Sequence, residues 1–248
     1  MVSPRMLSSA FYIHDELNDL LPPDKRGVPI ILQFNDDQSV KHLIESLGIP
    51  HTEIGAILVN GRQVDNSALL HDGDKVDVFP VAQAHMNSGN NLTPRFVVDN
   101  HLGQLARYLR MLGFDTLYRN DYRDDELARI SSLENRALLT RDRRLLMRNM
   151  VQNGYWVRSK IPRQQLVEVV QRFQLCSLIF PFKHCLRCNG LLQPVSKETV
   201  LHRLEPLTRK YFDQFRICPE CKQVYWQGSH YERMVGFIEQ VIAECGRG

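Results

Sequence analysis

The second half of the chain alternates short apolar runs with segments whose apolar residues recur at helical spacing. Each of four apolar runs predicts a strand, at residues 96–99, 115–118, 137–140 and 155–157. The segments that follow these runs predict helices, at residues 102–112, 124–133, 143–150 and 162–173. Strands and helices that alternate across short loops indicate an open parallel α/β sheet.

The first half has a different pattern, with several short strands and one helix. The strands are predicted at residues 29–34, 57–59, 63–64 and 75–80, and residues 11–13 can begin either a strand or a short helix. Ser39 is a suitable N-cap for a helix over residues 40–47, and Asn60-Gly61 predicts a tight turn between two strands.

This first pattern resembles the ubiquitin-like β-grasp fold of small sulfur-carrier proteins, an α+β domain. The resemblance rests on Ile57-Leu-Val-Asn-Gly61 and on Asp72-Gly-Asp-Lys-Val76 with Phe79-Pro80 after it. Sulfur carriers end in a free Gly-Gly tail, whereas this chain continues through Val81. The resemblance therefore implies a protein-interaction or scaffold role and not sulfur transfer.

A segment rich in turn-forming residues separates the two patterns. Residues 84–94 are nearly uncharged and contain Asn, Ser, Gly and Pro, which indicates a linker. We therefore expect a β-grasp domain at 1–83, a linker at 84–94, a nuclease-type sheet domain at 95–178, and a zinc ribbon with a C-terminal helix at 179–248.

The charges are distributed unevenly between the halves. Residues 1–90 hold 6 Lys/Arg and 12 Asp/Glu, whereas residues 91–248 hold 25 and 16, a net charge of +9. A basic half favours a polyanionic partner, although an unevenly charged surface without that role is the alternative. The sequence shows no signal peptide and no apolar run long enough to span a membrane, so we expect a cytoplasmic protein with no membrane partner.

Acidic residues follow or flank the predicted strands of the second half. Asp99 and Asp142 come at or just after strand ends, and Asp124 and Asp125 open the predicted helix between them. Ligands of open α/β sheets bind at this edge, and clustered carboxylates need a cation between them. Oxygen ligands favour Mg²⁺ or Mn²⁺, which can activate water for phosphodiester cleavage. The alternative is that Asp124, Asp125 and Asp142 only cap helices.

Arginines surround these acids. Five of them are candidates for binding RNA phosphates: Arg107, Arg110, Arg141, Arg143 and Arg144. Arg107 and Arg110 share a helix face and could instead pair with the carboxylates.

The cysteines form the most specific motif of the chain. Two CxxC pairs, 29 residues apart, predict a structural zinc site with four thiolate ligands: Cys185, Cys188, Cys218 and Cys221. Cys176 and Cys245 fall outside this pattern and are expected to be ordinary thiols. The stretch Tyr225-Trp-Gln-Gly-Ser-His230 could stack on RNA bases or pack against the zinc site.

Taken together, these motifs resemble the PIN-like ribonuclease domain named after the C-terminal region of the Mut-seven exonuclease. The resemblance rests on Arg95-Phe-Val-Val-Asp99, Leu102-Gly-Gln-Leu-Ala-Arg-Tyr-Leu-Arg110 and Leu139-Thr-Arg-Asp142, followed by the paired CxxC motifs. It implies a PIN-like fold, a zinc ribbon and metal-dependent RNA cleavage. Asp99, Asp142 and Asp124 or Asp125 match the family's acids, and Asp99 and Asp142 are the expected Mg²⁺ or Mn²⁺ ligands.

One departure from the resemblance leaves an alternative function open. Many PIN nucleases have another acid just after the fourth strand, whereas this chain has Arg158-Ser-Lys160. The chain could therefore be a non-catalytic RNA- or ribosome-binding protein that keeps the fold.

Overall fold

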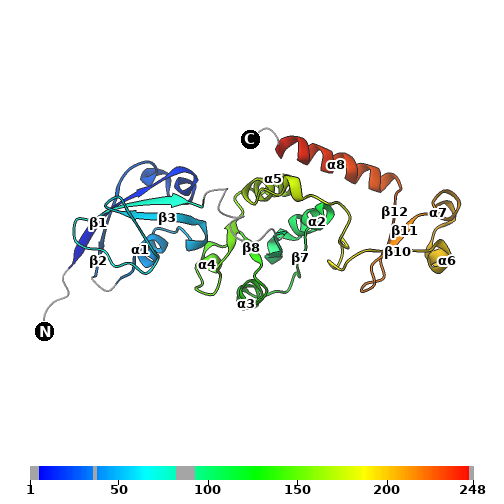
Figure 1. Cartoon of the computed structure of the whole chain (residues 1–248), viewed down its shortest axis with the longest axis horizontal. Coiled ribbons are helices and arrows are strands. Elements are labelled where there is room, and N and C mark those ends of the chain that lie inside the picture. Colours follow the sequence, from blue (N-terminus) through cyan, green and yellow to red (C-terminus); the bar gives the residue numbers. More distant parts are fainter. Residues whose placement is uncertain (1–5, 36–37, 82–92, 246–248) are drawn as a thin grey trace. The chain divides into compact units, whose positions relative to one another are not determined.

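The computed structural model describes residues 6–35, 38–81 and 93–245 (Figure 1). Most of the predicted linker, residues 84–94, lies outside them. The chain forms two compact units: the first contains Met1–Asn90 and Thr140–Trp156, and the second contains Asn91–Leu139 and Val157–Gly248. The domain boundaries expected from the sequence stay a prediction.

The first unit is built on a five-stranded sheet with the order β2-β1-β5-β3-β4. Its strands are β1 Leu7–Ile13, β2 Ile30–Phe34, β3 Ile54–Val59, β4 Arg62–Val64 and β5 Lys75–Pro80. β1 pairs antiparallel with β2 and parallel with β5. This is the expected β-grasp, and residues 11–13 belong to a strand. The 3₁₀ helices of this unit are Asp15–Leu20, Pro23–Lys25 and His51–Glu53.

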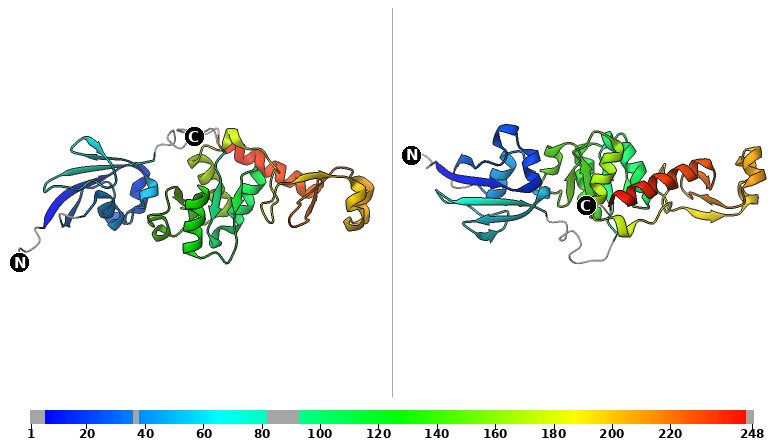
Figure 2. Two further views of the ribbon diagram at one scale, coloured as in Figure 1. Left: turned by 60° about the horizontal axis from the view of Figure 1, so that its bottom comes forward. Right: turned by 90° about the horizontal axis from the view of Figure 1, so that it is seen from above.

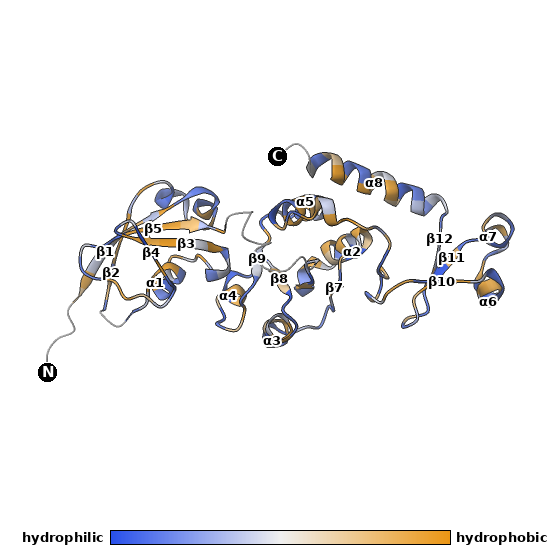
Figure 3. Ribbon diagram, viewed as in Figure 1, coloured by the Kyte–Doolittle hydropathy of each residue, from blue (hydrophilic) through white to orange (hydrophobic). Residues whose placement is uncertain are grey.

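Local sequence signals account for the helix and the tight turn of this sheet. Helix α1, Val40–Ser46, begins where the Ser39 hydroxyl accepts a hydrogen bond from the His42 N–H at 3.3 Å. Asn60 and Gly61 both have positive φ, 50° and 78°, as the tight turn between β3 and β4 requires. Figures 1 and 2 show α1 beside one face of the sheet, whose hydrophobic strands are coloured orange in Figure 3.

A distant segment completes the first unit. Thr140–Trp156 includes α4 Arg143–Leu146 and β9 Gly154–Trp156, so α4 ends four residues before the predicted Met150. The Trp156 N–H donates to the Glu53 carboxylate at 2.7 Å, and His51 donates to the Val151 carbonyl at 2.8 Å. Glu53 is only 2% exposed, so the segment supplies a partner for a buried charge.

The second sheet has the strand order β7-β6-β8-β9. β6 Phe96–Val98 lies parallel to both β7 Thr116–Leu117 and β8 Ala137–Thr140. All four residues of β8 are buried, as are those of β6, which is typical of a parallel sheet covered on both faces. The alternation predicted from the sequence is confirmed.

Helices α2 Gly103–Leu112, α3 Asp124–Glu134 and α5 Pro162–Arg172 belong to this second unit, with 3₁₀ turns at Asn100–Leu102 and Cys176–Leu178. α2 ends at Gly113, whose φ is 99°. A Cβ on this glycine would lie 1.9 Å from the Phe180 carbonyl oxygen, so no other residue fits there without a backbone shift.

The C-terminal part of the second unit is a small sheet followed by a long helix. The sheet order is β10-β11-β12, with β10 Gln193–Val195, β11 Phe215–Ile217 and β12 Val224–Trp226. Between β10 and β11 lie α6 Lys197–Val200, a 3₁₀ turn at Leu201–Arg203 and α7 Pro206–Tyr211. Helix α8, Ser229–Cys245, packs along α5, and Phe237 stacks on Tyr108 of α2 with ring centroids 4.8 Å apart. Within the described residues, no helix has the length and apolarity needed to cross a membrane.

Candidate functional site

Asp99 lies at the carboxyl end of β6, in the middle of the parallel sheet. Its backbone N–H donates to the Leu139 carbonyl at 3.0 Å, directly beyond the paired residues Val98 and Leu139. The residue is 6% exposed. A buried carboxylate at this edge is costly unless its surroundings satisfy it, which makes Asp99 a candidate functional group.

Asp124 and Asp125 open α3, as expected, and both are exposed. Asp125 forms an ion pair with Arg123 at 3.2 Å. Acids in the first turn also interact favourably with the helix dipole. This placement is compatible with both the catalytic and the helix-stabilising interpretation of the two residues.

Asp142 caps α4. Its carboxylate accepts a hydrogen bond from the Arg144 N–H at 2.8 Å, and its own N–H donates to the Thr140 hydroxyl at 2.9 Å. The capping alternative for Asp142 is therefore present in the structure, where the residue belongs to the first unit. A capping carboxylate keeps further acceptor positions, so its metal role stays a prediction.

Two of the predicted RNA-binding arginines have structural partners. Arg110 is 3% exposed and donates to the carbonyls of Thr116, Leu186 and Arg187, at 2.9, 3.3 and 3.0 Å. Burial lowers the pKa of its guanidinium. These bonds connect α2 to the strand β7 and to the backbone of the cysteine region, and the RNA-binding role of Arg110 stays a prediction.

Arg143 is also engaged, in this case within the first unit. It donates to the Leu20 carbonyl at 2.6 Å, and its guanidinium lies 4.1 Å from the centre of the Trp156 ring. By contrast, Arg107 and Arg144 are exposed, and Arg141 is half-buried. The sequence could not separate these roles, because the partners of Arg143 are distant in the chain.

The segment after Val157, where an acid was expected, receives a carboxylate from α5. Glu168 accepts hydrogen bonds from the N–H groups of Arg158 and Ser159, at 2.8 and 3.1 Å. Sequence reasoning missed Glu168 because it comes from a helix and not from the strand end. Both of its oxygens bind the backbone, which gives the residue a role in shaping this loop.

The four cysteines come together as predicted. Among the described residues, they are the one group of three or more His, Cys, Asp or Glu side chains whose ligand atoms all lie within 4.8 Å of one another. The Sγ atoms of Cys185 and Cys221 are 3.5 Å apart, and those of Cys188 and Cys218 are 3.3 Å apart. Tetrahedral zinc–thiolate bonds place sulfurs roughly 3.8 Å apart, so the cluster is consistent with zinc.

The two CxxC motifs have the same local geometry. The Cys185 carbonyl accepts from the Asn189 N–H, and the Cys218 carbonyl accepts from the Lys222 N–H, both at 2.9 Å. Asn189 and Lys222 both have positive φ, 75° and 60°. Each motif is therefore a tight turn that presents two sulfurs, and four thiolates leave no open coordination position.

Tyr225 supports the cysteine cluster. Its hydroxyl lies 3.1 Å from the Cys185 Sγ and accepts from the Leu186 N–H at 3.1 Å. Burial opposes ionisation of Cys185, but the Tyr225 and backbone hydrogen bonds outweigh it and lower the pKa of the thiol to about 7. Burial raises the pKa of the Cys188 and Cys221 thiols, so the Tyr225 hydrogen bond distinguishes Cys185 from these two.

Two further residues near the cysteine cluster, His184 and Cys176, form bonds in the structure. His184 is buried and hydrogen-bonded through Nδ1 to the Asn189 carbonyl at 2.8 Å, so it supports a turn of the cluster. Cys176 is disulfide-bonded, which corrects the expectation that it is an ordinary thiol.

Comparisons with known proteins agree with this architecture. A family model described as the Mut7-C RNAse domain matches residues 94–238, and one described as Mut7-C ubiquitin matches residues 6–86. The first of these supports a nuclease-like function in general. No curated protein matches the chain.

Two solved structures from Haloferax volcanii are similar to part of the chain. The HVO 2177 protein has 21% identity and a TM-score of 0.26, over 31% of this chain and 85% of that one. SAMP1 has 16% identity and a TM-score of 0.25, over 34% of this chain and 99% of that one.

Proposed function

Because this chain belongs to the Mut7-C RNAse domain family, we propose that it is a metal-dependent ribonuclease that hydrolyses RNA phosphodiester bonds. The observation that carries the proposal is the buried carboxylate of Asp99 at the carboxyl end of β6. In open α/β sheets this edge is where ligands bind.

The proposed ligand residues are Asp99 and Asp142, with Asp124, or its neighbour Asp125, as the third acid. Asp99 directly follows β6, and Asp142 follows the adjacent parallel strand β8 by two residues. Carboxylate oxygens fit Mg²⁺ or Mn²⁺ in both charge and hardness. When bound, such an ion lowers the pKa of a water molecule and stabilises charge on the phosphate oxygens.

The chain's own residues would have three tasks in this reaction. The carboxylates fix the position of the ion, and a carboxylate oxygen can accept the proton of the attacking water. Arg107 and Arg144, both exposed, would bind phosphates of the substrate. The net charge of +9 over residues 91–248 supports a polyanionic substrate such as RNA.

The test is cleavage of single-stranded and structured RNA in the presence of Mg²⁺ or Mn²⁺. Asp99→Asn and Asp142→Asn keep the side-chain shape but remove charge, and each should slow cleavage about 100-fold or more. Asp121→Asn is the matched control, because Asp121 is exposed and paired with Arg119 at 2.7 Å. Equal cleavage by wild type and both variants would contradict the proposal.

A non-catalytic RNA-binding or ribosome-binding role is the second candidate. The observation in its favour is Glu168, whose two oxygens bind backbone N–H groups of a segment where an acidic ligand was expected. This role predicts RNA binding without cleavage in wild type and in the Asp99→Asn variant alike.

We further propose that the β-grasp domain is a protein-interaction module. β2 is an edge strand of its sheet and carries Ile31, which is largely exposed. Edge strands with exposed apolar residues are suited to pairing with another chain.

A further inference from the structure

Two adjacent cavities lie around the turn between β12 and α8. Their volumes are about 470 Å³ and 530 Å³, within the usual size range of ligand pockets. They share five lining residues: Leu186, Tyr225, Trp226, Tyr231 and Met234. We call the two cavities and these shared residues the ribbon groove.

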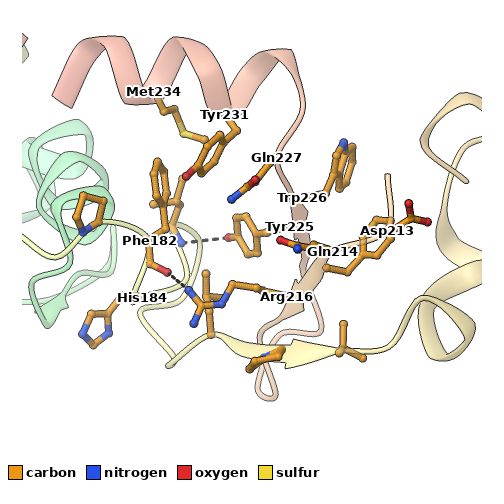
Figure 4. A pocket seen from close by; sticks show the side chains of 16 residues that line it. Phe182, His184, Asp213, Gln214, Arg216, Tyr225, Trp226, Gln227, Tyr231 and Met234 are labelled. Atoms are coloured by element: carbon orange, nitrogen blue, oxygen red, sulfur yellow. Dashed lines mark hydrogen bonds between the residues drawn. The ribbon is translucent and has the colours of Figure 1, made fainter. Parts of the chain in front are cut away.

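The first cavity is lined by aromatic rings, of which Trp226 is the most exposed. Phe182 packs on Tyr231 with ring centroids 4.6 Å apart, and the Tyr225 hydroxyl is used by the cysteine turn (Figure 4). Trp226 is 38% exposed, and within the described part of the chain it has no hydrogen-bond or ring partner. An exposed indole at a cavity is suited to stacking on a planar group.

The indole is held at its edge by close backbone packing. A Cβ on Gly228 would lie 2.9 Å from the Trp226 Nε1, so the absence of a side chain at Gly228 lets the turn approach the ring. The cavity also contains one acid, Asp213, but Lys197 neutralises it at 2.7 Å. The paired Asp213 therefore adds no net negative charge that would repel an anion from this cavity.

The second cavity is cationic. Arg107 of α2, Arg187 between the first two cysteines and His230 of α8 line it, and its lining contains no Asp or Glu. Arg107 and Arg187 are exposed, and neither guanidinium has a hydrogen-bond or ion-pair partner among the described residues. Two guanidinium groups without an acidic partner are suited to binding a phosphate.

We propose that the ribbon groove binds single-stranded RNA, with an unpaired base on Trp226 and a neighbouring phosphate at Arg107 and Arg187. The choice of RNA rests on the proposed function, and the inference adds which form of RNA is bound and where. A base must be unpaired to stack on a protein side chain, which favours single strands over duplex. The aromatic and cationic cavities share a wall, as the alternation of base and phosphate requires.

The first test is equilibrium binding of a labelled oligouridylate of about twelve nucleotides, a length typical of single-strand sites. The full chain carries Asp99→Asn so that the RNA stays intact. Trp226→Ala should weaken binding roughly tenfold, as expected for one lost base stack. Tyr211→Ala, which removes an exposed aromatic ring of α7 outside both cavities, should bind like the parent.

The arginines are tested by salt dependence. Arg107→Gln with Arg187→Gln should weaken binding and reduce the slope of log affinity against log salt by about 0.7, the value for one lost single-strand phosphate contact. Arg233→Gln, on an exposed position of α8 outside both cavities, is the control and should leave the affinity within twofold, as expected for a surface change. Equal losses in this control and in the double variant would overturn the inference, because binding would then depend on charge alone.

A direct readout uses the only two tryptophans of the chain, Trp156 and Trp226. In the Trp156→Phe variant, fluorescence comes from Trp226 and should be quenched by the oligouridylate. Absence of quenching while the RNA is bound would overturn the inference and leave the proposed ribonuclease intact. Conversely, RNA binding through Trp226 without any cleavage would support the groove and contradict the proposed ribonuclease.

Discussion

A network of ion pairs and hydrogen bonds around the buried Arg136 connects the parallel sheet to the cysteine region. Arg136, 5% exposed, donates to both carboxylate oxygens of Asp115, at 2.8 and 3.0 Å, and to Glu134 at 2.8 Å. Asn189, in the first cysteine turn, donates to the same Asp115 at 2.7 Å. Burial alone would raise the pKa of Asp115, but the hydrogen bonds from Arg136 and Asn189 outweigh it and lower the pKa.

Asp115→Asn should therefore reduce the free energy of unfolding at pH 7 by ~2 kcal/mol, because it leaves the Arg136 charge buried without its main partner. A carboxyl with a lowered folded-state pKa stabilises the fold above its unfolded pKa, about 4, and this contribution is lost as the pH falls through the folded value. Urea unfolding measured from pH 7 to pH 3 should show the two proteins converging at low pH. Asp121→Asn is the control, and its exposed pair with Arg119 should contribute less than about 0.5 kcal/mol.

At the scale of single elements, the sequence predicted those helix ends and turns that depend on neighbouring residues. The N-cap Ser39, the Asn60-Gly61 turn, the end of α2 at Gly113 and the two CxxC turns all lie where the sequence placed them. The hydrogen bonds of Arg110 could not be predicted, because two of its acceptors, the carbonyls of Leu186 and Arg187, lie 76 and 77 residues away in the chain. Helical periodicity shows which face a side chain leaves from but not which distant backbone it reaches.

The cysteine turns and the β10-β11-β12 sheet form an element with little apolar core of its own. Its buried apolar residues are the cluster Val200, Leu204, Phe215 and Val224, with Leu192 packed against the cysteines. A small core of this kind usually needs a metal for stability. Removal of zinc with a chelator should therefore speed amide hydrogen exchange in residues 180–228 more than in the parallel sheet.

The measurement is amide hydrogen exchange with and without chelator, which resolves the two parts of the second unit. Cys221→Ser should reproduce the effect without chelator, because it removes one ligand of a closed site. Unchanged exchange in residues 180–228 after stoichiometric zinc release would contradict a structural metal role.

At the scale of the whole molecule, the chain passes from the first unit to the second, returns for Thr140–Trp156, and leaves again. The pattern of residues 140–156 predicts one more helix and one more strand, which α4 and β9 confirm, but it does not indicate which unit the segment contacts. The segment belongs to the first unit because of non-local hydrogen bonds, such as those of Trp156 with Glu53 and of Val151 with His51. The acidic site could be proposed from strand ends, but sequence spacing does not encode the tertiary arrangement of its residues.

A fragment of residues 1–83 should accordingly be less stable than the same domain in the full chain. Glu53→Gln weakens the acceptor of the Trp156 N–H, and should destabilise the first unit of the full chain by ~1–2 kcal/mol. The same substitution in the fragment should have a smaller effect, because Trp156 is absent from it. The measurement is thermal unfolding of the full chain and of the fragment, each with and without Glu53→Gln. An equal loss of stability in the full chain and in the fragment would show that residues 140–156 do not stabilise the β-grasp.

The return of the chain also has a consequence for synthesis on the ribosome. Most domains can fold once their own residues have left the exit tunnel, N-terminal domains first. Here the buried Glu53 carboxylate can accept its hydrogen bond from Trp156 only after more than a hundred further residues have been synthesised. The nascent β-grasp therefore emerges incomplete and stays so until the central strands β6 and β8 of the other unit have also been made. The Trp156–Glu53 hydrogen bond is therefore among the last contacts of the first unit that can form during synthesis.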